Sequence, residues 1–296
     1  MRSDFPNPSP VPTYAERPVT KVPNWHGLVV LDLLFNNLTT GLFLCAAVSE
    51  LLAPAAFGAV ARVAYPLAMA LLIADLVCLV LDLGDPLRFH HMLRVWKPSS
   101  PMSLGTWSLV AYSVPLTVLT ALSLWPAPAQ AEALRRIVLL VGLLPAFGAS
   151  LYKGVLFSTT AQPGWREARW LGGYLVNSAF LLGAGLMLSL AVLLDQPQAS
   201  RVLRPALIAL VPIHLAALGL LLSGIGPRLA EVRSGRQRAS LGAVVVVGGM
   251  LAPMLLLVLD SHVAHLIAVA LLLTSAVVAR AELVFLPHRR PLAGIR

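Results

Sequence analysis

Charged residues are scarce in this chain. Asp, Glu, Lys and Arg make up 12% of its 296 residues, whereas soluble globular domains average about 25%. Hydrophobic residues account for 58% of the chain, and the mean hydropathy is +0.81. Such a composition excludes an ordinary soluble enzyme and indicates an integral membrane protein.

Cysteine is also nearly absent. The chain has only Cys45 and Cys78, and both lie in apolar segments. We expect buried free thiols, although a single disulfide between them remains open. An iron–sulfur cluster takes four thiolates, so any cluster must belong to another subunit. The sequence predicts no metal site in this chain.

The first 23 residues contain no apolar run of the kind found in a secretory signal. They are rich in proline and polar residues. We expect residues 1–26 to form an extended arm that could lie on a partner, and the first apolar segment to serve as an uncleaved membrane signal.

Long apolar runs dominate the rest of the chain. A membrane-spanning helix needs about 20 mainly apolar residues, and the runs are too long and too little alternating for the strands of a barrel. The sequence predicts an all-α integral membrane protein with eight transmembrane helices in two four-helix bundles. The eight segments are Leu28–Leu52, Val60–Leu83, Ser103–Leu124, Ile137–Phe157, Leu171–Leu194, Leu203–Ser223, Leu241–Leu259 and His262–Phe285.

A polar stretch at residues 159–169 separates four predicted spans from the other four. We therefore expect a first four-helix bundle at 27–158 and a linker at 159–169. A second bundle would cover 170–287, and a tail 288–296. With most residues inside spans, no soluble catalytic domain remains.

Basic residues are distributed unevenly. With eight spans, seventeen of the 22 Lys and Arg residues fall on the side that holds both termini. The positive-inside rule then places both termini in the cytoplasm, with the chain in the cytoplasmic (inner) membrane. Nucleic-acid binding is a poor explanation, because the basic residues flank spans. The basic stretch 227–238 is expected to be a loop, either anchored at lipid headgroups or used to dock a partner.

One short polar stretch stands out in this apolar chain. Residues 82–91 read Asp-Leu-Gly-Asp-Pro-Leu-Arg-Phe-His-His, and ionisable groups near hydrocarbon usually mark a functional site. Asp75 and Asp82 are two helical turns apart and share a face. The predicted topology brings Asp32, Asp82 and Tyr152 to one membrane surface, so we expect these three to converge.

Quinone chemistry has matching requirements. The two carbonyls of a quinone accept hydrogen bonds, its reduction adds two protons, and its tail needs an apolar cleft. The expected quinone-binding residues are Asp82, Tyr152, Asp32, His26 and Arg88. The expected proton relay is Asp82, Asp75 and Asp32. The expected partner-facing loop residues are His90, His91, Arg94 and Lys97.

Structural roles for these residues remain open alternatives. Asp82 could cap a turn or pair with Arg88, and Tyr152 could be an interfacial anchor. His90 and His91 could simply face water or headgroups.

The motifs around the second and fourth spans resemble a known family. Asp-Leu-Gly-x-Pro-Leu-Arg-Phe at 82–89 is followed by Lys-Pro-Ser-Ser-Pro-Met-Ser-Leu-Gly-Thr-Trp at 97–107. Together with Tyr-Lys-Gly-Val-Leu-Phe-Ser at 152–158 and Pro-x-Trp at 163–165, these runs resemble the NrfD/PsrC family of polysulfide-reductase-type membrane subunits. The match extends from about Trp25 to Trp165. In the second half it rests on helix count and Arg280.

The resemblance implies a quinone site in the first bundle, with menaquinone or ubiquinone as the cofactor and no haem. It carries the family's aspartate of the second span onto Asp82 and the tyrosine of the fourth span onto Tyr152. Two positions depart from the family pattern. Lys153 replaces a threonine, and an ungapped alignment puts Val29 and Asp32 where polysulfide reductases carry Asn and His.

The resemblance also implies partners. A ferredoxin-like iron–sulfur subunit would dock over the site and contact a catalytic subunit, expected to be of the molybdopterin type. Many family members dock this partner outside the membrane, whereas the charge distribution here favours the cytoplasmic side. Both placements stay open, as do the substrate of the complex and the direction of electron flow.

Other functions fit part of the pattern. A stand-alone secondary transporter also uses two helical bundles with acidic residues inside spans, but it would work without a partner. A di-haem cytochrome would use His214 with His262 or His265, and a visible spectrum would reveal it. A purely structural anchor would need no quinone.

Overall fold

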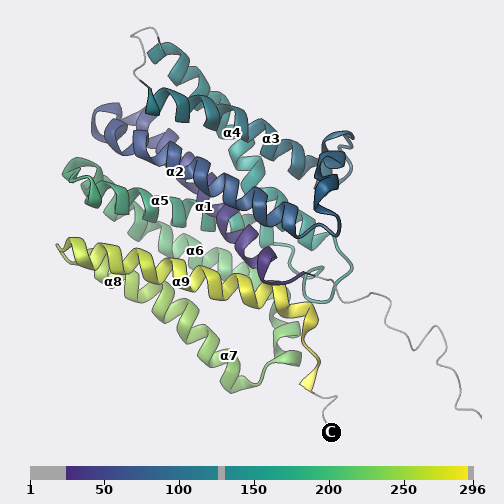
Figure 1. Cartoon of the computed structure of the whole chain (residues 1–296). Helices are drawn as coiled ribbons and strands as arrows, with labels where there is room; N and C mark the ends of the chain where they lie inside the picture. The colour runs from purple at the N-terminus through teal and green to yellow at the C-terminus, as the bar shows by residue number, and fades with distance from the viewer. Residues whose placement is uncertain (1–24, 126–130, 293–296) are drawn as a thin grey trace, which may run out of the picture.

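The computed structural model describes residues 25–125 and 131–292, and every element in these two ranges is helical (Figure 1). The arm predicted for residues 1–26 lies outside the described residues, apart from Trp25 and His26. The end of the tail predicted for 288–296 also lies outside them.

Eight helical spans cross the molecule, as predicted. Each is long and apolar enough to cross a bilayer by length and composition. The elements are α1 (Gly27–Leu52), α2 (Pro54–Leu81), the 3-10 helix η2 (Pro86–Leu93), α3 (Pro101–Leu124), α4 (Ala131–Ser158), α5 (Leu171–Leu193), α6 (Pro197–Val232), α7 (Gly235–Gly242), the π-helix η3 (Ala243–Leu251), α8 (Ala252–Val258), α9 (His262–Phe285) and the 3-10 helix η4 (Leu286–His288). The consecutive elements α7, η3 and α8 together form the seventh span.

Local sequence determines where several helices begin. Proline occupies the first turn of α2, α3 and α6, a position that needs no backbone donor. Ser100 and Ser261 accept hydrogen bonds from Ser103 N and Ala264 N, which caps α3 and α9.

The helices α1 and α5 form the centre of the molecule. Their most apolar segments are 83% and 67% buried, whereas the other six spans are about one-third buried or less. α1 packs against α2, α4, α5 and α9. A side chain at Gly41 would collide with the backbone of Ala179, and one at Gly183 would collide with the backbone of Gly41. The two halves of the chain therefore meet in backbone contact along α1 and α5.

The basic stretch 227–238 is not the loop that the sequence predicted. α6 continues to Val232 with Pro227 inside it, and α7 begins at Gly235. Ser234 and Gln237 form a capping box that starts α7, with hydrogen bonds of 3.3 and 3.0 Å. Only Arg233 and Ser234 separate the two helices. α6 continues beyond its apolar segment to Val232, and the capping box at Ser234 starts α7 directly after it.

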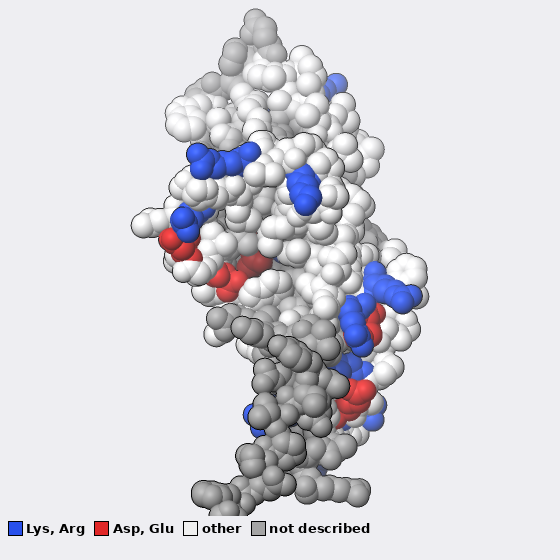
Figure 2. All heavy atoms as spheres, turned by 90° about the vertical axis from the view of Figure 1, so that its right-hand side faces the viewer, with Lys and Arg blue, Asp and Glu red and all other residues white. Residues whose placement is uncertain are grey.

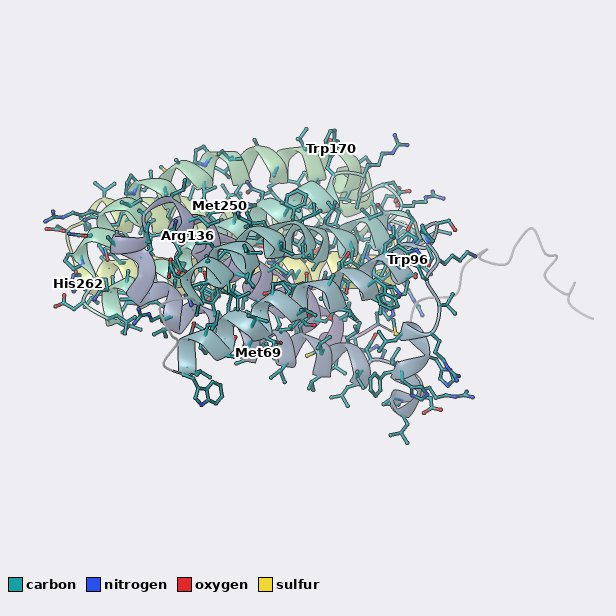
Figure 3. The ribbon with its side chains drawn as sticks, turned by 90° about the horizontal axis from the view of Figure 1, so that it is seen from above. Met69, Trp96, Arg136, Trp170, Met250 and His262 are labelled. Atoms are coloured by element: carbon teal, nitrogen blue, oxygen red, sulfur yellow. The ribbon has the colours of Figure 1, made fainter. Side chains whose placement is uncertain are left out.

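The starts of odd-numbered spans and the ends of even-numbered spans lie at one end of the molecule, here called the basic end. Trp96 and Trp170 mark it in Figure 3, and His262 lies at the opposite end. Figure 2 views the basic end directly and shows Lys and Arg side chains with fewer acidic ones among them.

A buried ion pair joins three helices at the opposite end. Arg135 Nε lies 2.5 Å from Glu50 Oε1, and Arg135 Nη2 donates to Glu50 Oε2 at 3.1 Å. The hydroxyl of Tyr65 donates to the same carboxylate at 2.6 Å. The pair therefore links α1, α2 and α4 far from the polar motifs of the sequence.

Candidate functional site

A cluster of three charged residues lies buried in the first half of the chain. Lys153 Nζ is 2.7 Å from Asp32 Oδ1 and 2.8 Å from Asp75 Oδ1, and it also donates to the backbone oxygen of Asp32 at 3.0 Å. The exposed fractions of Asp32, Asp75 and Lys153 are 7%, 0% and 2%. One ammonium thus joins α1, α2 and α4 inside the membrane-spanning region.

Neutral polar groups extend this cluster. Asn36 Nδ2 donates to Asp75 Oδ2 at 3.2 Å, and Thr40 donates to the backbone oxygen of Asn36 at 2.6 Å. One turn further along α1, Thr39 Oγ1 lies 2.9 Å from the hydroxyl of Tyr112 on α3. Buried polar groups therefore follow α1 inward from the basic end.

The three charges do not balance. Two carboxylates share one ammonium, so the fully ionised cluster carries one net negative charge in a region where charge is costly. Asp32 Oδ1 is buried, and its one contact among the described residues is the ion pair with Lys153. This oxygen can accept a proton or a donor from a bound molecule.

Tyr152 lies beside the cluster. It is 7% exposed, and the Lys153 ammonium lies 5.7 Å from the centre of its ring. On the other side, the Tyr152 ring packs so closely on Gly105 that any side chain there would collide with it. Gly105 of α3 thus holds the Tyr152 ring in place next to the buried charges.

Asp82 lies one residue beyond the end of α2, closer to the surface than Asp75. Burial raises the pKa of its carboxyl group, and electrostatic interaction with His26 partly offsets this rise. Within the described residues its carboxylate has no hydrogen bond or ion pair. Arg88 instead lies 3.7 Å from Asp85, so the alternative pairing of Arg88 with Asp82 is wrong.

The predicted convergence is therefore partial. The structure joins Asp32 to Asp75 through Lys153, keeps Tyr152 adjacent, and places Asp82 near His26 at the surface. The predicted site residues did not include Lys153, although it lies at the centre of the cluster. A lysine within an apolar span is a signal for such a role.

An exposed loop lies between α2 and α3. The predicted partner-facing residues all lie on its surface, and they are His90, His91, Arg94 and Lys97. Arg94 Nη1 lies 3.3 Å from His91 Nδ1, and His90 Nδ1 lies 3.1 Å from the backbone oxygen of Leu87. Leu87 is 85% exposed and Trp96 is 59% exposed. Basic and apolar side chains thus share one exposed surface.

An aromatic cluster fixes the linker at the same end. Trp25 stacks on Trp165 with ring centres 4.9 Å apart, and Phe157 lies 4.6 Å from Trp165. Trp165 is fully buried and its indole Nε1 donates to the backbone oxygen of Leu283 at 2.7 Å. The linker is therefore attached to the start of α1, the end of α4 and the end of α9.

The histidines and cysteines have ordinary packing partners. His214 Nδ1 lies 2.8 Å from Asn177 Oδ1, and His265 Nε2 lies 2.9 Å from the backbone oxygen of Leu259. Cys45 and Cys78 are free thiols. In residues 25–125 and 131–292, no group of three or more His, Cys, Asp or Glu side chains could hold a metal ion.

Eight apolar spans and a buried ionic cluster define a multi-pass integral membrane protein with a polar site in its first half. The family model described as "Polysulphide reductase, NrfD" matches residues 19–288. The chain belongs to the NrfD family, as its motifs indicated. No curated protein matches it.

Proposed function

We propose that this protein is the quinone-reactive membrane subunit of a multi-subunit respiratory oxidoreductase. It exchanges electrons between a menaquinone or ubiquinone and an iron–sulfur partner subunit. The observation that carries this proposal is the Asp32–Lys153–Asp75 cluster, buried behind the surface that bears Asp82 and the basic loop.

The residues present fit a quinone. A reduced quinone carries hydroxyl groups, and Asp32 Oδ1 is a buried acceptor without a hydrogen-bond partner. An oxidised quinone needs donors, and Tyr152 has a phenolic hydroxyl next to Lys153. His26 and Arg88, both exposed at this end, provide further donors. When bound, the quinone would supply two-electron chemistry coupled to two protons.

The residues of this chain bind the quinone and hold the protons. Tyr152 orients the ring by a hydrogen bond, with its own position fixed by Gly105. Asp82, near the surface, exchanges a proton with water. Asp32 and Asp75 hold a proton inside, and Lys153 keeps their carboxylates together. The raised pKa of Asp82 suits a group that both accepts and releases a proton.

The exposed loop between α2 and α3 suits the partner. The chain has no set of four thiolates, so the electrons need clusters on another protein. Arg88, Arg94 and Lys97 offer positive charge, and Leu87 and Trp96 offer exposed apolar area. A ferredoxin-like subunit that docks here leads on to a catalytic subunit of the molybdopterin type.

Quinone-linked turnover of the assembled complex tests the site. We expect Asp82→Asn and Tyr152→Phe each to abolish turnover while the complex still assembles. The first change removes the carboxylate that exchanges a proton, the second removes the hydroxyl that orients the quinone, and both keep the shape of the side chain. Asp85→Asn, on the same exposed segment, is the matched control and should retain activity. Normal turnover in both site variants would reject the assignment.

Co-purification tests the class of function. Tagged protein isolated in mild detergent should bring along an iron–sulfur subunit and a larger catalytic subunit, seen by mass spectrometry and metal analysis. A lone, iron-free protein that binds no quinone would instead favour the secondary transporter.

A further inference from the structure

A groove in the second half of the chain plays no part in the proposed quinone chemistry. It has a volume of about 310 Å³ and lies between α6, the α7–η3 segment and α9. This volume falls at the lower limit of ordinary small-molecule pockets. We propose that the groove binds one anionic phospholipid, with an acyl chain along its wall and the phosphate at its basic mouth.

The wall of the groove is apolar over a long stretch. The side chains that form it include Leu218, Leu221, Ile225, Val245, Val246 and Leu283. On α6 the lining runs from Leu218 to Leu229, a rise of about 16 Å along the helix axis. The groove therefore extends from the basic end well into the hydrocarbon region, which matches an extended acyl chain.

The π-helix η3 helps to form this groove. Val245 and Val246 of η3 line it, while Gly249 packs directly on Ser275 of α9. The Ser275 hydroxyl donates to the backbone oxygen of Val245 at 3.2 Å, which satisfies a carbonyl of the irregular turn. η3 is thus fixed on α9, with its other side turned to the groove.

The mouth of the groove has excess positive charge. Glu282 lines it and is already paired with Arg233 at 2.5 Å and Arg289 at 2.7 Å. Arg238 also lines it, is exposed, and has no ion-pair partner in the part of the chain that the structure describes. Arg238 therefore adds a positive charge that Glu282 does not neutralise, and this excess favours a phosphate.

A further hydrogen-bond donor lines the groove. Deeper in the groove, the hydroxyl of Tyr174 has no hydrogen bond to any described residue, so it can donate to an ester carbonyl. A neutral quinone head would leave the basic mouth unpaired, whereas a phospholipid satisfies both the mouth and the wall.

Native mass spectrometry of the purified full-length chain, with added phosphatidylglycerol or phosphatidylcholine of the same acyl chains, tests the proposal. We expect one phosphatidylglycerol to stay bound and phosphatidylcholine to bind weakly. Arg238→Gln should weaken phosphatidylglycerol binding about fivefold, the effect of one basic residue at a lipid surface. Arg201→Gln, an exposed arginine at the opposite end, is the matched control and should bind normally.

A second pair of variants tests the groove itself. A side chain at Gly242 or at Gly219 would meet no atom within 4 Å, but only Gly242 lines the groove. Gly242→Leu should therefore abolish the bound lipid, and Gly219→Leu should keep it. Equal lipid binding in all four variants, or equal binding of both lipids, would overturn the proposal.

Two measurements on the unmodified protein complete the test. A phosphatidylglycerol with a photoreactive group on its acyl chain should label Ile225 and Val245 more strongly than Val141, a lipid-exposed residue of α4. Added ubiquinone should leave the bound phosphatidylglycerol in place. Displacement by ubiquinone, or equal labelling of Val141, would reject a phospholipid site.

Discussion

Lys153 is surrounded by acceptors, and its environment shows what the residue does. Two carboxylates and one backbone oxygen lie within 3.0 Å of its ammonium. The residue is 2% exposed, so water cannot replace these contacts. Removing such a partner leaves buried charge uncompensated.

We expect Lys153→Met to lower the free energy of unfolding by about 3–5 kcal/mol, the usual effect of breaking a buried ion pair. The double variant Lys153→Met/Asp75→Asn should recover part of this loss, since it removes one uncompensated carboxylate. Thermal unfolding in detergent measures both. A single variant as stable as the original protein would show that the ammonium does not hold the helices together.

Asp82 should make stability depend on pH. Its pKa is raised in the folded protein by burial, so folding favours the protonated form, and the stability that protonation confers is present at low pH. It is lost as pH rises from the ordinary aspartate pKa of 3.8 through the raised pKa. Asp82→Asn should therefore raise the melting temperature at pH 7 more than at pH 4. The same gain in Asp85→Asn, or an equal gain at both pH values, would contradict this.

At the residue scale, the sequence predicted which acidic and aromatic residues lie at the site better than it predicted their contacts. Spacing and topology predicted that Asp32, Asp82 and Tyr152 converge. The structure instead places Asp32, Asp75 and Tyr152 around Lys153, and Asp82 lies nearer the surface. The sequence could not show that Lys153 points inward, because neighbouring residues on a helix project about 100° apart. That rotation is set by packing, here by the Tyr152 ring against Gly105.

Among the helices, α1 and α5 depend on small residues. Gly183 of α5 lies against the backbone of Gly41, so an added methyl group has no space. On the same helix, Gly173 is exposed and a side chain there would meet nothing within 4 Å. The two glycines therefore form a matched pair for substitution.

Gly183→Ala should destabilise the protein by about 1–3 kcal/mol through overpacking, whereas Gly173→Ala should be neutral or slightly stabilising because alanine is a better helix former. Thermal unfolding of the two variants in the same detergent compares them directly. Equal melting temperatures of the two variants would mean that the close contact between α1 and α5 does not contribute to the stability of the protein.

The number of spans follows from hydropathy alone, but their ends do not. Hydropathy ended the sixth span near Ser223, and α6 continues to Val232 because its last turns are amphipathic and Leu229 and Val232 are buried. The sequence also contains no pattern that predicts the π-helix η3. The Val245 carbonyl of this turn accepts a hydrogen bond from Ser275 of α9, and no local sequence pattern predicts that contact.

For the whole molecule, the basic end sets the expected orientation. Eight spans place both termini on one side, and the basic residues are concentrated there. We therefore propose a cytoplasmic location for both termini. A fluorescent protein fused after Arg296 should fluoresce, and alkaline phosphatase fused there should be inactive. An active phosphatase would place the basic end, and with it the docking surface, outside.

The backbone contact between α1 and α5 has a mechanical consequence. At Gly41 and Gly183 the backbones of α1 and α5 touch, with no side chains between them that could rearrange during a sliding motion. In addition, the indole of Trp165 ties the linker to α9 by a hydrogen bond. Rocking of one half against the other, which alternating access requires, would break both contacts. The frame around the buried charges is therefore rigid, and the proton transfer that we propose proceeds by rotation of individual side chains. We expect quinone-linked turnover of the complex to change little with bilayer thickness or lateral pressure.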